Sequence, residues 1–238
     1  MQEAMYVHHD GETQGAIDSA REVIPTIIQA LNPQSVVDVG CGPGAWLSVV
    51  QEFGVTDLLG IEGDHLDKNK LLLKPHQILF QDLEKPFTTD KKFDLVMCLE
   101  VAEHLSPMVA DSFVDSLVKL GDVLLFSAAI PHQGGYKHIN EQWPNYWQEK
   151  FNKHGFLFYD VLRPLIWHNP KIKWWYRQNL FIIAHQKLTL PFPGSDSLRN
   201  LVHPECLEDR LDEIYTGKNI KLSFDIFLKS ITRRLKVK

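Results

Sequence analysis

Three glycines at alternate positions follow a short apolar run, and this is the first sign of chemistry in the chain. The run at 36–39 is typical of a buried strand and contains Asp38, and it is followed directly by Gly40, Gly42 and Gly44. A glycine turn lets the backbone approach a ligand where a side chain would block it. The G-x-G-x-G spacing differs from the G-x-G-x-x-G of dinucleotide-binding proteins. We therefore predict a ligand site of another type here, against the alternative of an ordinary strand–turn–helix.

A second acidic residue, Glu62, follows the next apolar run at 58–61. Ligands of open α/β sheets bind beyond the carboxyl ends of the strands, so we expect Glu62 beside the glycine turn. A carboxylate there can accept both hydroxyls of a ribose. A dinucleotide site would use an acid similarly, and a solvated loop carboxylate is the other alternative, so Glu62 alone does not identify the ligand.

Two carboxylates and an imidazole, Glu100, Glu103 and His104, stand at i, i+3 and i+4. If Glu100 begins a helical turn, the three side chains share one face. Such a group can hold a divalent ion, since oxygen ligands favour Mg²⁺ or Mn²⁺ and imidazole widens the choice to Zn²⁺, Fe²⁺ or Co²⁺. The alternative is a site without metal, in which Glu103 caps or pairs locally and His104 lines a pocket.

A polar, aromatic segment at 130–147 contains two histidines and an acid, His132, His138 and Glu141. A hydroxyl whose pKa is far above neutral needs a base and alignment before it can attack. A histidine suits that role near pH 7. We predict His138 or His132 as the base, with Glu141 as an orienting or metal-binding partner; the alternative is loop histidines that bond backbone groups.

A second cluster precedes the last apolar run and combines aromatic rings with polar groups. If exposed, these side chains can stack on a sugar face and bond its hydroxyls. The alternative is that the tryptophans fill the core at the sheet edge. The members are Trp167, Trp174, Trp175, Tyr176, Arg177, Gln178 and Asn179.

Alternating strands and helices must position these residues, and they imply a mainly parallel sheet covered on both faces. The predicted strands are 35–39, 57–61, 77–80, 93–99, 122–128, 158–162 and 180–185. The predicted helices are 16–31, 45–53, 107–120 and 143–154.

The glycine turn, with Asp38 two residues before its first glycine, resembles motif I of the class I S-adenosylmethionine-dependent methyltransferases. The resemblance covers roughly residues 35–186. It implies an α/β, Rossmann-like three-layer sandwich with a seven-stranded, mostly parallel sheet and an antiparallel last strand. It also implies that the turn packs against the methionine part of the cofactor and that Asp38 helps to hold the turn and the ammonium end.

The same resemblance assigns further residues to the cofactor. Asp82 would bond the adenine amino group and Leu83 would pack near the ring, whereas a simple helix cap is the alternative for Asp82. Backbone atoms of Leu99 and Glu100 would line the pocket. The predicted cofactor site is therefore Asp38, Gly40, Gly42, Gly44, Glu62, Asp82, Leu83, Leu99 and Glu100.

The segment 100–104 looks like the E-x-x-E-H motif of metal-dependent O-methyltransferases, which include small-RNA 2′-O-methyltransferases and ubiquinone-pathway enzymes. Those enzymes need a further ligand from after the next strand, which here is His138 or His132. The implied metal ligands are Glu100, Glu103, His104 and His138.

The runs S-A-A-I-P at 127–131, H-I-N-E-Q-W-P-N-Y-W at 138–147 and W-W-Y-R-Q-N at 174–179 look like a bacterial subgroup of class I methyltransferases. Its members often occur with glycosyltransferases of surface-polysaccharide synthesis. This implies O-methylation of a sugar or glycan hydroxyl in polysaccharide biosynthesis, with His138, His132, His104 and Glu141 as catalytic candidates. His132 stands where the subgroup more usually has glycine, which favours His138.

Other functions stay open. The acceptor can instead be another small-molecule hydroxyl or an RNA 2′-hydroxyl, or the chain can be a non-catalytic partner that binds S-adenosylmethionine. The net charge of −5 argues against a nucleic-acid surface, which needs a basic stripe. An intact glycine turn, Glu62 and Asp82 argue against a non-catalytic role.

Length and composition set the organisation that we expect. The 238 residues suit a methyltransferase domain at 1–190, with an N-terminal helical segment, and a helical, basic appendage at 191–238. The first residues lack the basic and apolar regions of a signal peptide, so we expect a cytoplasmic protein. An oligomer is also compatible with the sequence.

The end of the chain, 217–238, is rich in Lys and Arg and carries a short apolar stripe. A basic amphipathic helix can make peripheral contact with an anionic membrane. The alternative is a helix docked on its own domain or on a second subunit. The stripe is Leu222, Ile226, Phe227, Ser230 and Ile231, with Lys229, Arg233 and Arg234 nearby.

Overall fold

A computed structural model describes residues 10–64, 66–192, 198–216, 220, 223–224 and 226–229. The chain divides into two compact units, one that ends at Leu201 and one that begins at Val202. Among the described residues, no helix combines the length and the apolar character that crossing a bilayer requires.

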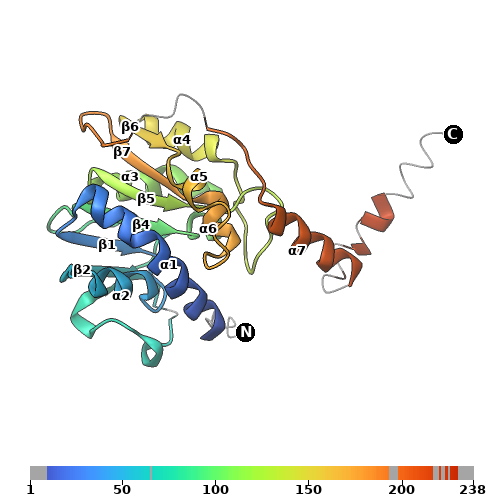
Figure 1. The fold of residues 1–238 in the computed structure, drawn as a ribbon, viewed down its shortest axis with the longest axis horizontal. Coiled ribbons are helices and arrows are strands. Elements are labelled where there is room, and N and C mark those ends of the chain that lie inside the picture. The colour runs from blue at the N-terminus through green and yellow to red at the C-terminus, as the bar shows by residue number, and fades with distance from the viewer. Residues whose placement is uncertain are drawn as a thin grey trace. The chain divides into compact units, whose positions relative to one another are not determined.

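The first unit is built on a seven-stranded sheet with the strand order β3-β2-β1-β4-β5-β7-β6. β7 is antiparallel to both neighbours, β5 and β6, while the other pairs are parallel. The predicted fold class is therefore confirmed. The strands are β1 (Ser35–Val39), β2 (Asp57–Glu62), β3 (Ile78–Phe80), β4 (Leu95–Leu99), β5 (Val123–Ser127), β6 (Phe156–Tyr159) and β7 (Phe181–His185) (Figure 1).

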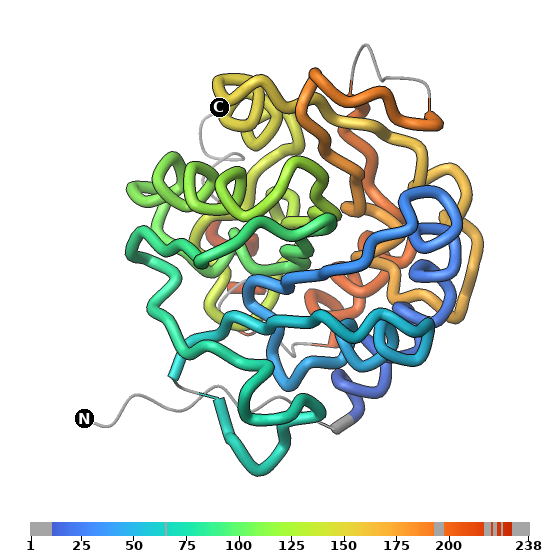
Figure 2. The backbone as a smooth tube through the Cα atoms, turned by 90° about the vertical axis from the view of Figure 1, so that its left-hand side faces the viewer, coloured from blue at the N-terminus to red at the C-terminus, as the bar shows by residue number. Residues whose placement is uncertain are grey.

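Helices cover both faces of the sheet. Figure 2 shows α1 and α2 on one side and α3 and α4 on the other. Successive strand residues point to opposite faces, so Leu95 and Met97 join one apolar cluster while Val96 and Cys98 join the other. The helices of this unit are α1 (Asp10–Leu31), α2 (Ala45–Glu52), α3 (Ala110–Leu120), α4 (Pro144–Asn152), α5 (Leu162–Ile166) and α6 (Trp174–Asn179).

Two predicted elements have other bounds in the structure, and one of them is the helix expected at 16–31, which is α1 and already begins at Asp10. The strand expected at 158–162 is β6, which begins earlier, because Gly155 with φ +76° ends the turn after α4. Leu162 instead begins α5, beside an ion pair between Arg163 and Asp160. The segment 174–179, where no helix was predicted, forms the short helix α6.

The second unit contains α7 (Pro204–Tyr215), which begins with a favourable cap. His203 Nδ1 accepts a hydrogen bond from Glu205 N at 3.3 Å, and Pro204 occupies the first helical position. Of the predicted apolar stripe, Ile226 and Phe227 are described and are 41% and 57% exposed. The predictions for Leu222, Ser230, Ile231, Arg233 and Arg234 lie outside the described residues.

Candidate active site

The glycine turn joins β1 to α2, and its backbone lies in the left-handed region. Gly40 has φ +73° and Gly44 has φ +91°. A Cβ at Gly40 would come within 2.4 Å of Val101 Cγ2, and one at Gly44 within 2.4 Å of Leu73 Cγ. Glycine is therefore required at both positions. The closeness of Val101 to Gly40 also shows that the turn packs against the segment that follows β4.

Glu62, at the end of β2, holds this turn in place. Its Oε2 accepts from Gly42 N and its Oε1 from Gly63 N, both at 2.7 Å. A carboxylate has about four acceptor sites and can accept from a ligand hydroxyl as well as from backbone N–H groups. As predicted, Glu62 lies beside the glycine turn.

Asp38 lies beside Glu62, since it pairs with Gly60 across β1 and β2. It is only 3% exposed. Burial and the charge of Glu62 raise the pKa of Asp38 to about 8. A cationic ligand group would stabilise the Asp38 carboxylate. S-adenosylmethionine carries two such groups, an ammonium and a sulfonium, and a ribose with vicinal hydroxyls. The carboxyl groups of Asp38 and Glu62 therefore fit this cofactor.

Asp82 follows β3 and shows the capping role that was the alternative to adenine binding. Its Oδ1 accepts from Glu84 N at 3.0 Å and its Oδ2 pairs with Lys85 Nζ at 3.0 Å. These hydrogen bonds lower the pKa of Asp82. Its backbone is near the cofactor side, because Gln81 N donates to Glu62 O at 2.8 Å. Leu83 is buried in the core.

Three side chains converge after β4 and β5: Glu103, His104 and His138. One ligand atom from each lies within 4.8 Å of the others. The two imidazole rings are 4.8 Å apart and nearly perpendicular. The loop that carries His138 is tied to this place, because Ile139 N and Asn140 N both donate to Glu103 O, at 2.9 and 3.0 Å. We call residues 130–143 the acceptor loop.

Glu103 is fully buried, and within the described part of the chain neither of its carboxylate oxygens has a hydrogen-bond partner. Burial and the nearby charge of Glu100 raise the pKa of Glu103 well above its usual value. A buried carboxylate without partners is unfavourable unless a cation or a proton satisfies it. The donor set of two imidazoles and a carboxylate therefore fits a divalent ion.

Glu100 does not begin a helical turn, contrary to the expectation for 100–104. Its φ of +55° sets it apart from the 3₁₀ turn (Ala102–His104) that carries Glu103 and His104. Its carboxylate instead accepts from Gln133 Nε2 at 3.0 Å and Asn179 Nδ2 at 3.1 Å. Glu100 therefore lies next to the group of three without belonging to it.

His138 and Glu141 form a pair within the acceptor loop. His138 Nδ1 is 3.1 Å from Glu141 Oε1. Burial alone would raise the pKa of Glu141, but hydrogen bonds from His138, Gly134 N and His132 N outweigh it and lower that pKa. Glu141 is thus a carboxylate that orients the imidazole. His132 contributes its backbone N–H, while its exposed ring lies outside the group of three.

The aromatic and polar cluster is mostly buried, which favours the core-filling alternative over an exposed sugar-binding surface. Tyr176, Arg177, Gln178 and Asn179 are each at most 7% exposed. Several of their polar atoms have internal partners, such as Tyr176 Oη, which accepts from Trp46 Nε1 at 3.3 Å. Sequence reasoning missed Gln133 and left open whether the cluster that contains Gln178 and Asn179 is exposed or buried.

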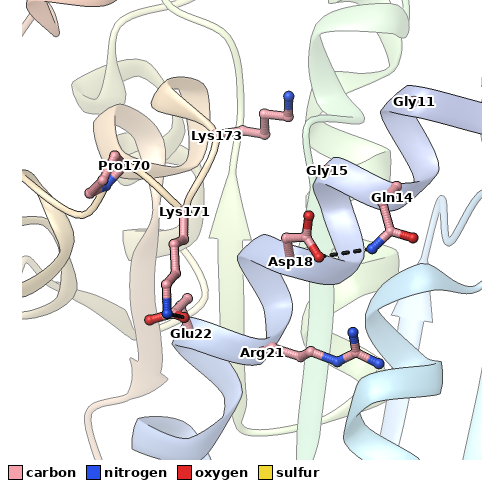
Figure 3. A pocket seen from close by; sticks show the side chains of 9 residues that line it. All are labelled: Gly11, Gln14, Gly15, Asp18, Arg21, Glu22, Pro170, Lys171 and Lys173. Carbon is pink, nitrogen blue, oxygen red and sulfur yellow. Dashed lines mark hydrogen bonds and ion pairs between the residues drawn. The ribbon is translucent and has the colours of Figure 1, made fainter.

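A separate groove of about 610 Å³ lies between α1 and residues 170–173 (Figure 3). Its charged groups are largely paired, as Lys171 with Glu22 at 3.0 Å. It shares no residue with the glycine turn or the acceptor loop. The lining residues are Gly11, Gln14, Gly15, Asp18, Arg21, Glu22, Pro170, Lys171 and Lys173.

Comparison with known proteins agrees with the class of fold that the sheet order defines, that of the class I methyltransferases. The solved structure of CalS10, an amino pentose methyltransferase from Micromonospora echinaspora, aligns with a TM-score of 0.54 and 16% identity, over 78% of this chain and 100% of that chain. The model of a family described as "Methyltransferase domain" matches residues 14–203. The chain therefore belongs to this methyltransferase family.

Curated relatives match only in part. Ubiquinone biosynthesis O-methyltransferase of Haemophilus ducreyi is 30% identical over 115 residues, which are 44% of this chain and 49% of the relative. (S)-tetrahydroprotoberberine N-methyltransferase of Eschscholzia californica is 28% identical over 126 residues, which are 50% and 36% of the two. The chain thus spans about a third to a half of the length of these relatives.

Proposed function

We propose that this chain is an S-adenosylmethionine-dependent O-methyltransferase that acts on a sugar or glycan hydroxyl. The observation that carries the proposal is the His138–Glu141 pair, held on the acceptor loop next to the segment against which the glycine turn packs. When bound, S-adenosylmethionine supplies a methyl group on a positively charged sulfur.

Asp38 and Glu62 hold the cofactor in this proposal. The buried Asp38 carboxylate attracts its cationic end, and the Glu62 carboxylate accepts hydrogen bonds from its ribose hydroxyls. The left-handed turn at Gly40 and Gly44 lets the backbone approach closely. Together they fix the direction from which a hydroxyl must attack.

His138 takes the proton of the attacking hydroxyl. With Nδ1–H donated to Glu141, Nε2 is the ring atom that accepts a proton. The Glu141 carboxylate then stabilises the imidazolium that forms, because its lowered pKa keeps it charged. A base of this kind is needed because a sugar hydroxyl is barely ionised near neutral pH.

The comparisons support the reaction more than the acceptor. The Haemophilus relative is named as an O-methyltransferase and the Eschscholzia relative as an N-methyltransferase. CalS10 is described as a sugar methyltransferase, but at 16% identity it supports the fold alone. The sugar acceptor therefore rests on the resemblance of the three sequence runs to the polysaccharide subgroup.

Product mass spectrometry tests the proposal directly. The chain is incubated with methyl-labelled S-adenosylmethionine and a panel of nucleotide sugars, with small phenols and a short RNA as the competing acceptors. A labelled methyl ether on a sugar supports the proposal. Label on a phenol or on RNA establishes one of the other acceptors, and cofactor binding without any product establishes a non-catalytic partner.

Glu62→Ala is expected to weaken cofactor binding by about 1–3 kcal/mol, because it removes charge-assisted hydrogen bonds to the ribose. It also leaves Gly42 N without its acceptor. Calorimetry with S-adenosylhomocysteine measures the change. Asp64→Ala, which removes a nearby exposed carboxylate paired with Lys68, is the matched control and should bind normally. Equal affinities of the two variants would contradict the role of Glu62.

A second feature of the site favours metal dependence: the buried carboxylate of Glu103 facing His104 and His138. These three residues would hold a divalent ion. The Glu141 carboxylate, which bonds Nδ1–H of His138, would fix the orientation of that imidazole as a ligand. Bound there, the ion would act as a Lewis acid and would lower the pKa of an attacking hydroxyl.

Metal removal therefore has an expected result. EDTA should abolish activity and Mg²⁺ or Mn²⁺ should restore it, while Glu103→Gln should remove the response and the metal binding seen by calorimetry. Glu149→Gln, an exposed carboxylate on α4, is the control and should change neither. Turnover that is insensitive to EDTA refutes the metal and leaves His138 as the base.

A further inference from the structure

Glu100 is held in an unusual backbone conformation at the carboxyl end of β4. Its φ of +55° lies in the left-handed region, which is unfavourable for a residue other than glycine. Its N–H donates to Ser127 O at 3.0 Å and lies 3.1 Å from Ser127 Oγ, at the end of β5. Such a conformation persists only where the surroundings hold it.

Side-chain amides hold the Glu100 carboxylate from two directions. Gln133 Nε2 donates to Oε2 at 3.0 Å, and Asn179 Nδ2 lies 3.1 Å from Oε1 and 3.3 Å from Oε2. A carboxylate only accepts hydrogen bonds, so the amide nitrogens must face it. Gln133 and Asn179 are 6% and 2% exposed, so water does not compete for these bonds.

The amides also bond one another, which closes the network. Gln133 Oε1 accepts from Asn179 Nδ2 at 2.9 Å and from Gln178 Nε2 at 3.0 Å. Gln178 is fully buried. We call the side chains of Glu100, Gln133, Gln178 and Asn179 the amide network. A buried network with its hydrogen bonds made specifies one arrangement of the segments that contribute to it.

Those segments are far apart in the sequence. Gln133 belongs to the acceptor loop, whereas Gln178 and Asn179 belong to α6. α6 is itself anchored, since Tyr176 accepts from Trp46 of α2 and Gln178 O accepts from Arg163 Nη1 at 3.2 Å. The amide network thus connects the acceptor loop to α6. The bond between Trp46 and Tyr176 then connects α6 to α2, the helix that follows the glycine turn.

The acceptor loop needs such an anchor. His132, Gly134 and Lys137 all have positive φ, at 70°, 73° and 55°. A loop with strained residues keeps one conformation only where bonds at several points hold it. His138 lies in this loop, and an error of about 1 Å in the position of a catalytic group can lower a rate by about 100-fold.

We propose that Gln133 and Asn179 are positioning residues, which fix the Glu100 side chain as the anchor of the acceptor loop and so hold His138 in place for methyl transfer. The role of His138 rests on the proposed function, whereas the anchoring of the loop does not. Glu100 acts in this account through the bonds that it accepts, and it is neither base nor metal ligand.

Asn179→Asp tests the proposal with almost no change in shape. It turns a donor that faces Glu100 into a second carboxylate. We expect kcat to fall by ~10–100-fold, with the affinity for S-adenosylhomocysteine changed by less than about twofold. We also expect faster amide hydrogen exchange in peptides that cover 130–143. Asn152→Asp, the same change at an exposed site on α4, should alter neither readout.

The reversed pair Glu100→Gln with Asn179→Asp separates positioning from chemistry. The new amide at position 100 can donate to the new carboxylate at position 179, so we expect slow exchange to return and kcat to recover by ~10-fold or more. Val114→Ala, which leaves a cavity at a buried position of α3, controls for loss of stability. It should leave exchange in 130–143 unchanged.

Three results would overturn the proposal. The first is that Asn179→Asp keeps the kcat and the amide exchange of the wild type. The second is that the reversed pair exchanges as fast in 130–143 as the single variant. The third is that the reversed pair regains slow exchange without regaining turnover. The last result would assign the Glu100 carboxylate a role in the chemistry itself. If the wild-type chain methylates no acceptor, the exchange experiment still decides whether the loop is anchored.

Discussion

Replacing His138 with alanine is expected to lower kcat by ~10²–10⁴-fold and to leave the affinity for the cofactor nearly unchanged. In the proposed mechanism the imidazole, oriented by Glu141 at 3.1 Å, takes the hydroxyl proton. The proposed cofactor site lies elsewhere, at the glycine turn, Asp38 and Glu62. Steady-state kinetics with the identified acceptor and calorimetry with S-adenosylhomocysteine measure the two quantities.

Two further variants make this result specific. His168→Ala removes an exposed imidazole between α5 and α6 and should keep full activity. His132→Ala removes a ring outside the group of three but keeps the backbone N–H that bonds Glu141, so it should lose little. Full activity in His138→Ala would transfer the role to His132 or His104, or end the general-base hypothesis.

The base and the metal make different use of the same imidazole. In both accounts Nδ1–H of His138 bonds Glu141, and the other ring nitrogen does the chemistry. It accepts a proton in the first account and coordinates an ion with Glu103 and His104 in the second. Loss of activity in His138→Ala fits both, so the response to EDTA decides between them.

The sequence was sufficient to predict features whose causes are local. Apolar runs identified most strands within two residues, because the central strands, such as β1 and β4, are buried on both faces. The placement of Glu62 beside Gly42 followed from one general rule, that ligands bind at the carboxyl ends of parallel strands. The convergence of Glu103, His104 and His138 agrees with the E-x-x-E-H resemblance.

Features that depend on distant partners were not predictable in this way. The sequence left open whether the polar residues of α6 are exposed; Asn179 is buried and bonds Glu100, which lies 79 positions earlier in the chain. The left-handed backbone of Glu100 is likewise set by bonds from Gln133 and Asn179. A sequence pattern records which groups need hydrogen bonds, but the fold decides where those bonds are made.

Gly42→Val is expected to weaken cofactor binding by ~100-fold or more, which is about 3 kcal/mol. Gly42 has φ +54° and donates its N–H to Glu62, so it lies in the turn that we propose contacts the cofactor. A branched side chain there would enter the proposed cofactor site. Calorimetry with S-adenosylhomocysteine measures the loss, and methyl transfer should disappear with it.

The control for this variant must separate a blocked site from a strained backbone. Gly54 also has positive φ, at +92°, and a Cβ there would meet no atom within 4 Å. Gly54→Val therefore places the same side chain on a left-handed backbone, far from the turn and in open space. Both variants should lower the melting temperature by similar amounts, since a β-branched residue is unfavourable at either position. Cofactor binding should be lost only in Gly42→Val; equal binding by the two variants would show that the turn does not contact the cofactor.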